Sequence, residues 1–319
     1  MTLGRGGPQV SRIGLGLAAT GRPAYITTHR DADFGIDRSE DALRKRTWQL
    51  LDAAYTAGVR YVDVARSYGS AEAFLSQWFA SRGDMDDLVV GSKWGYTYVG
   101  GWDIAATVQE VKDLSLATFE RQYRETVALL GDRLRLYQVH SLTIESGALE
   151  DAALLAALAR RRGDGLLLGI TTTGPEQAET IRRALEVRVD GVQLFSSVQA
   201  TWNLLETSAG DALAEASDAG WAVLVKEALA NGRLARSGDA AAAGTALGEA
   251  AAAAGLEPDV LALAAVLARP WVTVVLSGAA TVDQLLSNLR AADVEFGGLP
   301  ELAEPAVQYW SERSARRWT

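Results

Sequence analysis

The sequence has no cysteine and only two histidines, His29 and His140, among its 319 residues. The lack of cysteine excludes disulfides, thiolate nucleophiles, iron–sulfur clusters and cysteine-based zinc sites. Two histidines are too few for a histidine-rich metal site, so we expect no bound metal. Any proton transfer is therefore left to tyrosine, lysine, aspartate and these two histidines.

Positive charge and long apolar runs are scarce as well. Lys and Arg number 31 against 40 Asp and Glu, so the formal net charge is −9 and no broad positive field is present for nucleic acid or an anionic membrane. The longest uncharged stretch, Gly191–Leu205, is too short and too polar to cross a bilayer. The segment Met1–Ile13 lacks the apolar core of a signal peptide. We expect a cytoplasmic protein with a small-molecule ligand and with neither a nucleic-acid nor a membrane partner, and its oligomeric state stays open.

Short apolar runs alternate with longer amphipathic ones along the chain. The candidate strands are Ser11–Leu17, Arg60–Asp63, Leu88–Lys93, Leu134–His140, Gly165–Thr171, Gly191–Leu194, Ala222–Val225 and Thr273–Leu276. The candidate helices are Ser39–Ala57, Ala71–Arg82, Ser115–Leu130, Glu150–Arg161, Pro175–Val187, Ala209–Ala219, Pro258–Ala268 and Val282–Ala291. Consecutive apolar and β-branched residues suit strands that are buried on both faces by helices. The alternation predicts a single α/β domain over residues 1–319, a (β/α)8 TIM barrel.

Three segments exceed a minimal barrel. Loops 18–38 and 226–257 follow the first and seventh predicted strands, so they lie at the C-terminal face, where barrel enzymes build their sites. The second loop contains the Ala-rich tract Ala240–Ala254, for which a helix and a mobile flap are both open. The tail 300–319 has a helical pattern and two tryptophans, which either cover the barrel mouth or dock the tail.

Three successive predicted strands deliver residues that can transfer protons. In chain order these residues are Asp63, Tyr68, Lys93 and His140. A buried carboxylate keeps a neighbouring lysine charged, and a nearby ammonium lowers the pKa of a tyrosine toward working pH. Tyr68 would then serve as a general acid–base. Each residue alone is more often structural, and the tyrosines of segment 96–98 compete for Lys93, but four such residues together favour a shared site.

Residues 62–69, VDVARSYG, resemble the Asp-Thr-Ala-x-x-Tyr-Gly motif of the aldo-keto reductases. Lys93 and His140 match that family's next two catalytic positions in the same order. The resemblance runs from Arg12 to Asn288, nearly the whole chain. It implies a barrel that binds an extended nicotinamide dinucleotide, NADP or NAD, without a Rossmann fold. Consistent with this, no G-x-G-x-x-G follows a predicted strand.

The same resemblance implies hydride transfer between a nicotinamide and a carbonyl or secondary alcohol. Tyr68 would protonate the carbonyl oxygen, and Lys93, held by Asp63, would tune Tyr68. His140 would orient the carbonyl and stabilise its developing negative charge. Aldehydes, ketones and sugars are all open as substrates. Two other functions stay open, a cofactor-binding regulatory or sensor subunit with little turnover, and a barrel lyase or isomerase that reuses the four residues.

The resemblance also assigns residues to the cofactor. Thr171 keeps a hydroxyl for the carboxamide, Thr172 stands where the family has asparagine, and Gln193 matches the family's glutamine on the sixth strand. Lys226 stands where many members stack a tyrosine on the nicotinamide. Two roles for it are open: its aliphatic stem packs in the place of that tyrosine, or its ammonium contacts the pyrophosphate. The start of the last helix would bind phosphate through its backbone amides. The expected cofactor residues are Ala18, Thr171, Thr172, Gln193, Lys226, Leu229, Gly232, Ser277, Gly278, Thr281, Gln284 and Asn288.

One cation is missing from this set. Family members that prefer NADP usually have a lysine or arginine soon after the glycine at position 278. Here residues 279–283 read AATVD, with no cation and one aspartate. Because bidentate phosphate recognition favours arginine, we expect a weakened NADP preference and use of NAD, unless Arg290 or a distant lysine reaches the phosphate.

The substrate pocket is predicted only in type. Tyr25, Trp94 and Trp102 are aromatic residues in or near the segments that follow the first and third strands. Such side chains suit a flat or ring-shaped substrate, although packing within the loops would explain them equally well.

Overall fold

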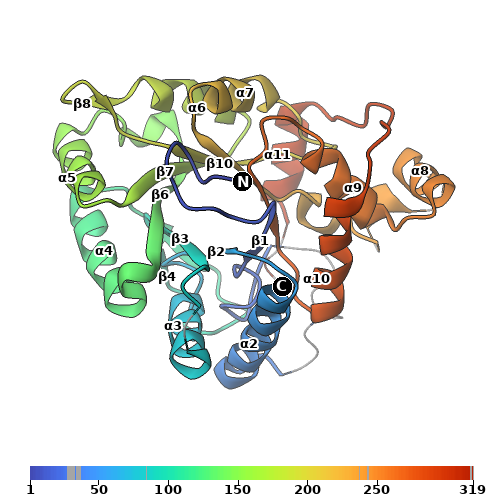
Figure 1. Ribbon diagram of the computed structural model, residues 1–319, viewed down its shortest axis with the longest axis horizontal. Coiled ribbons are helices and arrows are strands. Elements are labelled where there is room, and N and C mark those ends of the chain that lie inside the picture. The colour runs from blue at the N-terminus through green and yellow to red at the C-terminus, as the bar shows by residue number, and fades with distance from the viewer. Residues whose placement is uncertain are drawn as a thin grey trace.

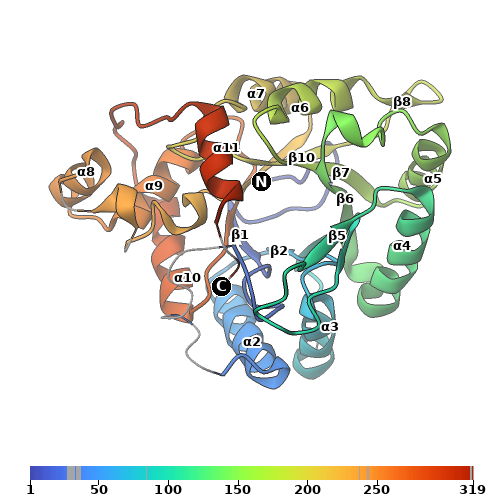
Figure 2. The same ribbon diagram turned by 180° about the vertical axis from the view of Figure 1, so that it is seen from behind.

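Eight parallel strands close into a barrel, and helices surround it (Figures 1 and 2). The computed structural model describes residues 1–26, 33, 37–83, 85–236, 238–242, 244–316 and 318, so His29 lies outside the described residues. The barrel strands are β1 (Ile13–Gly16), β2 (Tyr61–Asp63), β3 (Val89–Trp94), β6 (Leu134–Leu142), β7 (Leu167–Thr172), β10 (Ser197–Thr201), β11 (Ala222–Lys226) and β12 (Val274–Ser277). This arrangement confirms the predicted (β/α)8 barrel.

Several helices begin at a residue whose side chain caps the first turn. The helices are α2 (Glu40–Thr56), α3 (Ala71–Arg82), α4 (Leu116–Leu130), α5 (Ala152–Gly163), α6 (Gln177–Glu186), α7 (Gly210–Asp218), α8 (Ala246–Ala254), α9 (Pro258–Leu267), α10 (Val282–Leu289) and α11 (Ala306–Ser314). Ser39, Ser115 and Thr281 precede α2, α4 and α10, and each side chain accepts a hydrogen bond from an amide of the first turn. These bonds satisfy amides that a helix start leaves unpaired.

The predicted sixth strand is wrong. Residues of Gly191–Leu194 form β9 (Val192–Gln193), which pairs antiparallel with β8 (Arg188–Val189) outside the barrel. The barrel strand is β10, which is buried along its whole length, whereas the side chain of Val192 is 54% exposed. β10 alternates polar and apolar residues because its polar side chains face a polar barrel interior, so it lacks the apolar run by which the other strands were predicted.

The barrel interior is apolar toward the N-terminal ends of the strands. Its buried cluster comprises Leu3, Val10, Tyr61, Val89, Leu136, Ala222, Leu224, Val274 and Leu276. Because Leu3 and Val10 belong to it, the N-terminal segment closes this end of the barrel. A larger apolar cluster lies between the strands and the surrounding helices. Polar side chains are thereby left to the C-terminal half of the interior.

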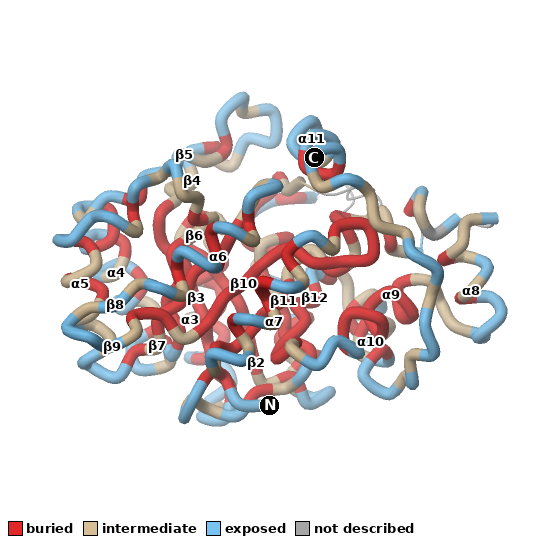
Figure 3. The backbone as a smooth tube through the Cα atoms, turned by 90° about the horizontal axis from the view of Figure 1, so that it is seen from above, coloured by how far each residue is buried: buried red, intermediate tan, exposed pale blue. Residues whose placement is uncertain are grey.

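Two added elements stand at the C-terminal face. They are a hairpin of β4 (Tyr96–Tyr98) and β5 (Glu110–Lys112), and the tail helix α11. Figure 3 shows both at one end of the barrel and the N-terminus at the other. Most of the Ala-rich tract forms the helix α8, one of the two alternatives left open by the sequence. The hairpin and α11 therefore border the mouth of the barrel at this face.

Membrane-spanning potential is limited to one bent helix pair. Within the described ranges, no single helix is long and apolar enough to cross a membrane. The helices α8 and α9 together have the length and apolar composition of a membrane span, but the chain bends by 93° between them.

Candidate active site

A buried ion pair lies at the centre of the site. Lys93, at the end of β3, pairs through Nζ with Asp63 Oδ2, at the end of β2. The same Nζ donates to the carbonyl oxygen of Val64 at 3.0 Å and to the hydroxyl oxygen of Tyr68 at 3.2 Å. Lys93 and Asp63 are 1% and 2% exposed. The tyrosine that contacts Lys93 is therefore Tyr68 and not one of the tyrosines of β4.

A glutamine missed by the sequence analysis completes the ion pair. Gln199, on β10, donates from Nε2 to Asp63 Oδ1 at 2.8 Å, and it is 1% exposed. Gln193, predicted for the sixth strand, lies in the outer β8–β9 pair, where its side chain donates to the carbonyl oxygen of Leu185 at 3.0 Å. The correction follows from the shift of the sixth strand, and of these two glutamines it is Gln199 that faces the barrel interior.

The expected lowering of the Tyr68 pKa is wrong for this structure. Burial raises the pKa of Tyr68 well above its ordinary value of 10, and the charge of Asp63 adds to the shift. Burial also lowers the pKa of Lys93, against the opposing effect of Asp63. The sequence reasoning counted the nearby ammonium but not the burial. Tyr68 consequently stays protonated, which is the form that a proton donor needs.

His140 packs against the ring of Tyr68 as a neutral imidazole. Its ring centroid is 5.7 Å from that of Tyr68 and 5.0 Å from that of Tyr96. Burial lowers the pKa of His140 well below 6.5, and the charge of Lys93 lowers it further. Its Nδ1 is buried with no hydrogen-bond partner among the described residues. One nitrogen of a neutral imidazole carries a proton, so the side chain can donate to a substrate oxygen.

The predicted nicotinamide residues divide into two groups. Thr171 is at the C-terminal end of β7, and its Oγ1 accepts from the amide of Ser141 at 2.7 Å, which leaves its hydroxyl proton free to donate. Thr172 is fully buried and contacts Gln177 of α6 at 3.4 Å. The structure thus places Thr171 toward the barrel interior, and Thr172 toward the surrounding helices.

The predicted phosphate end is assembled as a helix start. Asn288 Nδ2 donates to Ser277 Oγ at 2.9 Å, and Gln284 Oε1 accepts from the amide of Ala280 at 2.9 Å. Gly278 is exposed, and a Cβ there would meet nothing within 4 Å. Open space at Gly278 before the N-terminus of α10 fits a bound phosphate.

A buried charge network follows β11. Lys226 Nζ donates to Thr201 Oγ1 at 2.8 Å and lies 5.9 Å from the Trp310 ring centroid. Glu227 accepts from Arg313 of α11, with Nε at 2.8 Å from Oε2. Despite its burial, the charges of Arg313 and Lys226 hold the pKa of Glu227 well below its ordinary value. Burial lowers the pKa of Lys226 to about 8. These contacts dock the tail helix over the barrel mouth.

The remaining predicted cofactor residues lie in segments at the same face. Ala18 lies two residues after β1, while Leu229 precedes and Gly232 ends a short turn after β11. Their assignment to the cofactor stays a prediction.

The predicted substrate residues are placed in three different environments. Trp94 is fully buried and packs against Phe119 of α4, with ring centroids 5.1 Å apart, so it faces away from the pocket. Because Lys93 faces inward, its neighbour on the strand must face outward. Trp102 donates from Nε1 to the carbonyl oxygen of Arg38 at 2.9 Å, which is loop packing. Tyr25 remains at the mouth, next to the Trp318 ring at 6.3 Å.

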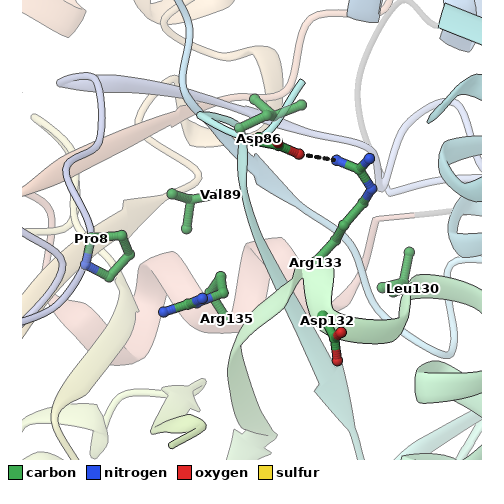
Figure 4. A pocket seen from close by; sticks show the side chains of 8 residues that line it. Pro8, Asp86, Val89, Leu130, Asp132, Arg133 and Arg135 are labelled. Atoms are coloured by element: carbon green, nitrogen blue, oxygen red, sulfur yellow. Dashed lines mark ion pairs between the residues drawn. The ribbon is translucent and has the colours of Figure 1, made fainter. Parts of the chain in front are cut away.

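A pocket at the opposite end of the barrel takes no part in this arrangement. It has a volume of about 520 Å³ and lies at the N-terminal ends of β3 and β6. Figure 4 shows Arg133 beside Asp86 there, with Arg135 and Pro8 nearby. None of the four proton-transfer residues lines it. Within the described ranges, no group of three or more His, Asp and Glu side chains could hold a metal ion.

Comparisons with known proteins agree with this geometry. The sequence model of the Aldo/keto reductase family matches residues 12–297. Aldo-keto reductase ausK of Emericella nidulans is 28% identical over 233 residues, 71% of this chain and 54% of that protein. Uncharacterized oxidoreductase YrpG of Bacillus subtilis is 25% identical over 92% of this chain and 91% of its own length. Norsolorinic acid reductase of Aspergillus flavus is 28% identical over 49% of this chain and 40% of its own length.

Solved structures share the fold. The holo form of aldo-keto reductase AKR11C1 from Bacillus halodurans has a TM-score of 0.69 and 21% identity over 98% of this chain and 95% of that one. At this identity the likeness concerns the barrel alone. This chain matches the family model along most of its length. It spans only about half of the length of aldo-keto reductase ausK.

Proposed function

The chain belongs to the aldo/keto reductase family, and we propose that it is an NAD(P)-dependent oxidoreductase in which Tyr68 is the proton donor in the reduction of a carbonyl group. The observation that carries the proposal is the contact between Lys93 Nζ and the Tyr68 hydroxyl, 3.2 Å, made while the ammonium pairs with buried Asp63. A hydroxyl fixed by a buried ion pair has a defined position for proton transfer.

The residues present fit a nicotinamide dinucleotide. The hydroxyl of Thr171 is free to donate to a carboxamide, Lys226 supplies a buried ammonium, and Gly278 leaves open space at a helix start. When bound, the reduced nicotinamide supplies hydride to the carbonyl carbon. Tyr68 gives the proton that the carbonyl oxygen takes up. His140 donates a hydrogen bond to the same oxygen and holds it in place.

We place the substrate among aromatic carbonyl compounds. Tyr25, Tyr96 and Trp318 lie around Tyr68 and His140 at the barrel mouth, and their rings can pack on a flat substrate. A panel of aryl aldehydes, aryl ketones, aliphatic carbonyls and sugars, followed by nicotinamide absorbance, tests the proposal. Turnover of aryl substrates is expected; binding of cofactor without any turnover would favour a regulatory role.

We expect NADH to bind at least as tightly as NADPH. Residues 279–283 contain no cation, and Gln284 Nε2 donates to the carboxylate of Asp33 at 2.7 Å, so negative charge lies at the adenosine end. A 2′-phosphate there would be repelled. Fluorescence titration with both cofactors measures the ratio of dissociation constants. Asp33→Asn should improve NADPH binding a few-fold, roughly the effect of one screened charge, and Asp218→Asn on remote α7 should not. A strong preference of the unaltered protein for NADPH would contradict this expectation.

Cofactor affinity should fall as the pH rises through about 8. The pKa of Lys226 is lowered to about 8, so its ammonium is present below that pH and lost above it. If this ammonium attracts the pyrophosphate, the dissociation constant rises on the alkaline side. Titrations of NADH binding between pH 6 and 10 test the expectation. Lys226→Met should bind more weakly and independently of pH over this interval, and a persisting pH dependence would assign the effect to another group.

A further inference from the structure

Arg22, in the segment after β1, is a buried cation beside the proposed proton donor. It is 2% exposed. Its guanidinium carbon lies 5.3 Å from the ring centroid of Tyr68, 4.5 Å from that of Trp318 and 5.6 Å from that of Tyr25. Three aromatic rings therefore surround the guanidinium, and one of them is the ring that carries the reactive hydroxyl.

Two loops fix this arrangement by a close backbone approach. The amide of Ser70 donates to the carbonyl oxygen of Gly21 at 2.8 Å. A Cβ on Gly69 would lie 2.4 Å from that oxygen and 2.8 Å from the Cβ of Arg22, and Gly69 has a positive φ of 58°. Only glycine suits such a position. The segment that carries Arg22 is thereby locked to the segment that carries Tyr68.

Hydrogen bonds then orient the guanidinium. Its Nη1 donates to the carbonyl oxygen of Ser67 at 2.8 Å and to Glu110 Oε1, in the hairpin strand β5, at 2.5 Å. Ser67 immediately precedes Tyr68, so the same arginine holds the backbone and covers the ring. Glu110 is 15% exposed, and it balances part of the arginine's charge.

We propose that Arg22 is a positioning residue that stabilises the phenolate formed when Tyr68 gives its proton to the substrate oxygen. The proposal rests on the proposed function, since it requires Tyr68 to be the donor. In the step, the O–H bond of Tyr68 breaks and an O–H bond forms on the substrate, which leaves negative charge on the phenol. A cation against the ring attracts that charge more strongly than it attracts the neutral ring.

Several other groups act on Tyr68 and set the direction of the test. Burial and the carboxylates of Asp63, Glu110 and Glu227 raise the pKa of Tyr68, whereas Arg22 lowers it. The other titratable groups that face it are Lys93, His140, Tyr25 and Tyr61. Because Glu110 neutralises Arg22, removing the carboxylate and removing the guanidinium should act in opposite directions.

The experiment compares pH profiles of kcat/KM for alcohol oxidation, which rises with pH because Tyr68 must then accept a proton. Arg22→Met should move the profile to higher pH by about one unit, so that activity at a fixed pH falls about tenfold. Glu110→Gln should move it to lower pH, and Arg22→Lys should lie close to the unaltered enzyme. NADH affinity should change little in all three. Arg161→Met removes a matched arginine, 4.5 Å from the Tyr123 ring on the outer surface, and should leave the profile in place.

The outcomes separate the two proposals. If the pH profile of kcat/KM moves in opposite directions for Arg22→Met and Glu110→Gln, the electrostatic role is supported. If Arg22→Met does not fold, an Arg22→Lys variant with the profile of the unaltered enzyme supports the same role. Loss of activity in both variants at every pH, or an unmoved profile in both, overturns it and leaves Arg22 a structural residue. Neither result affects the assignment of Tyr68 as the proton donor, which is tested separately by Tyr68→Phe and its control variant.

Discussion

Tyr68→Phe is expected to lower kcat for carbonyl reduction by about 10³-fold, within the range that general acid catalysis contributes. The substitution deletes one oxygen atom and leaves the ring against Arg22 and His140. The loss should therefore fall on the chemical step, because the contacts that hold the ring remain. Steady-state reduction of an aryl aldehyde, followed by nicotinamide absorbance, measures it.

Two measurements accompany this variant. The dissociation constant for NADH should stay within about twofold of the unaltered enzyme, a change that corresponds to less than about 0.5 kcal/mol. Tyr96→Phe is the matched control, because Tyr96 also packs on His140, whereas the hydroxyl that contacts Lys93 is that of Tyr68. Turnover by Tyr68→Phe, or an equal loss in Tyr96→Phe, would reassign the proton donor.

The strand ends could be predicted because their signals are local. Asp63, Lys93 and His140 each follow a short apolar run, and parallel barrel strands bring such ends to one face. Ser39, Ser115 and Thr281 likewise mark helix starts within a few residues of sequence. For these elements, no information about distant contacts is needed.

What escaped prediction depends on distant contacts or on burial. Gln199 was missed because its strand carries inward-facing polar residues, which in a sequence resemble a loop. The pair of Arg22 and Glu110 joins residues 88 positions apart, one in the loop after β1 and the other in the hairpin strand β5, and no local pattern indicates that they approach each other. The raised pKa of Tyr68 depends on burial, which a count of neighbouring charges omits. By contrast, the outward orientation of Trp94 follows from alternation along β3 once Lys93 is placed inside.

Lys93→Met should abolish turnover and also destabilise the fold by about 3–5 kcal/mol, the usual cost of leaving one charge of a buried pair without its partner. In this variant the carboxylate of Asp63 stays buried, with Gln199 at 2.8 Å and the Tyr61 hydroxyl at 3.5 Å as its remaining partners. Two neutral hydrogen-bond donors do not replace an ammonium in a low-dielectric interior. The midpoint of urea unfolding measures the loss.

The double variant Asp63→Asn with Lys93→Met separates stability from catalysis. Removing both charges leaves no buried ion without a partner, so most of the lost stability should return, while turnover stays absent because no ammonium holds the Tyr68 hydroxyl. Arg82→Met is the control, since the pair of Arg82 with Asp52 is 35% and 42% exposed and solvent already screens it. Its unfolding midpoint should stay unchanged. If Lys93→Met were as stable as the unaltered protein, the pair would not be a buried ion pair, and the assigned role of Asp63 would fall with it.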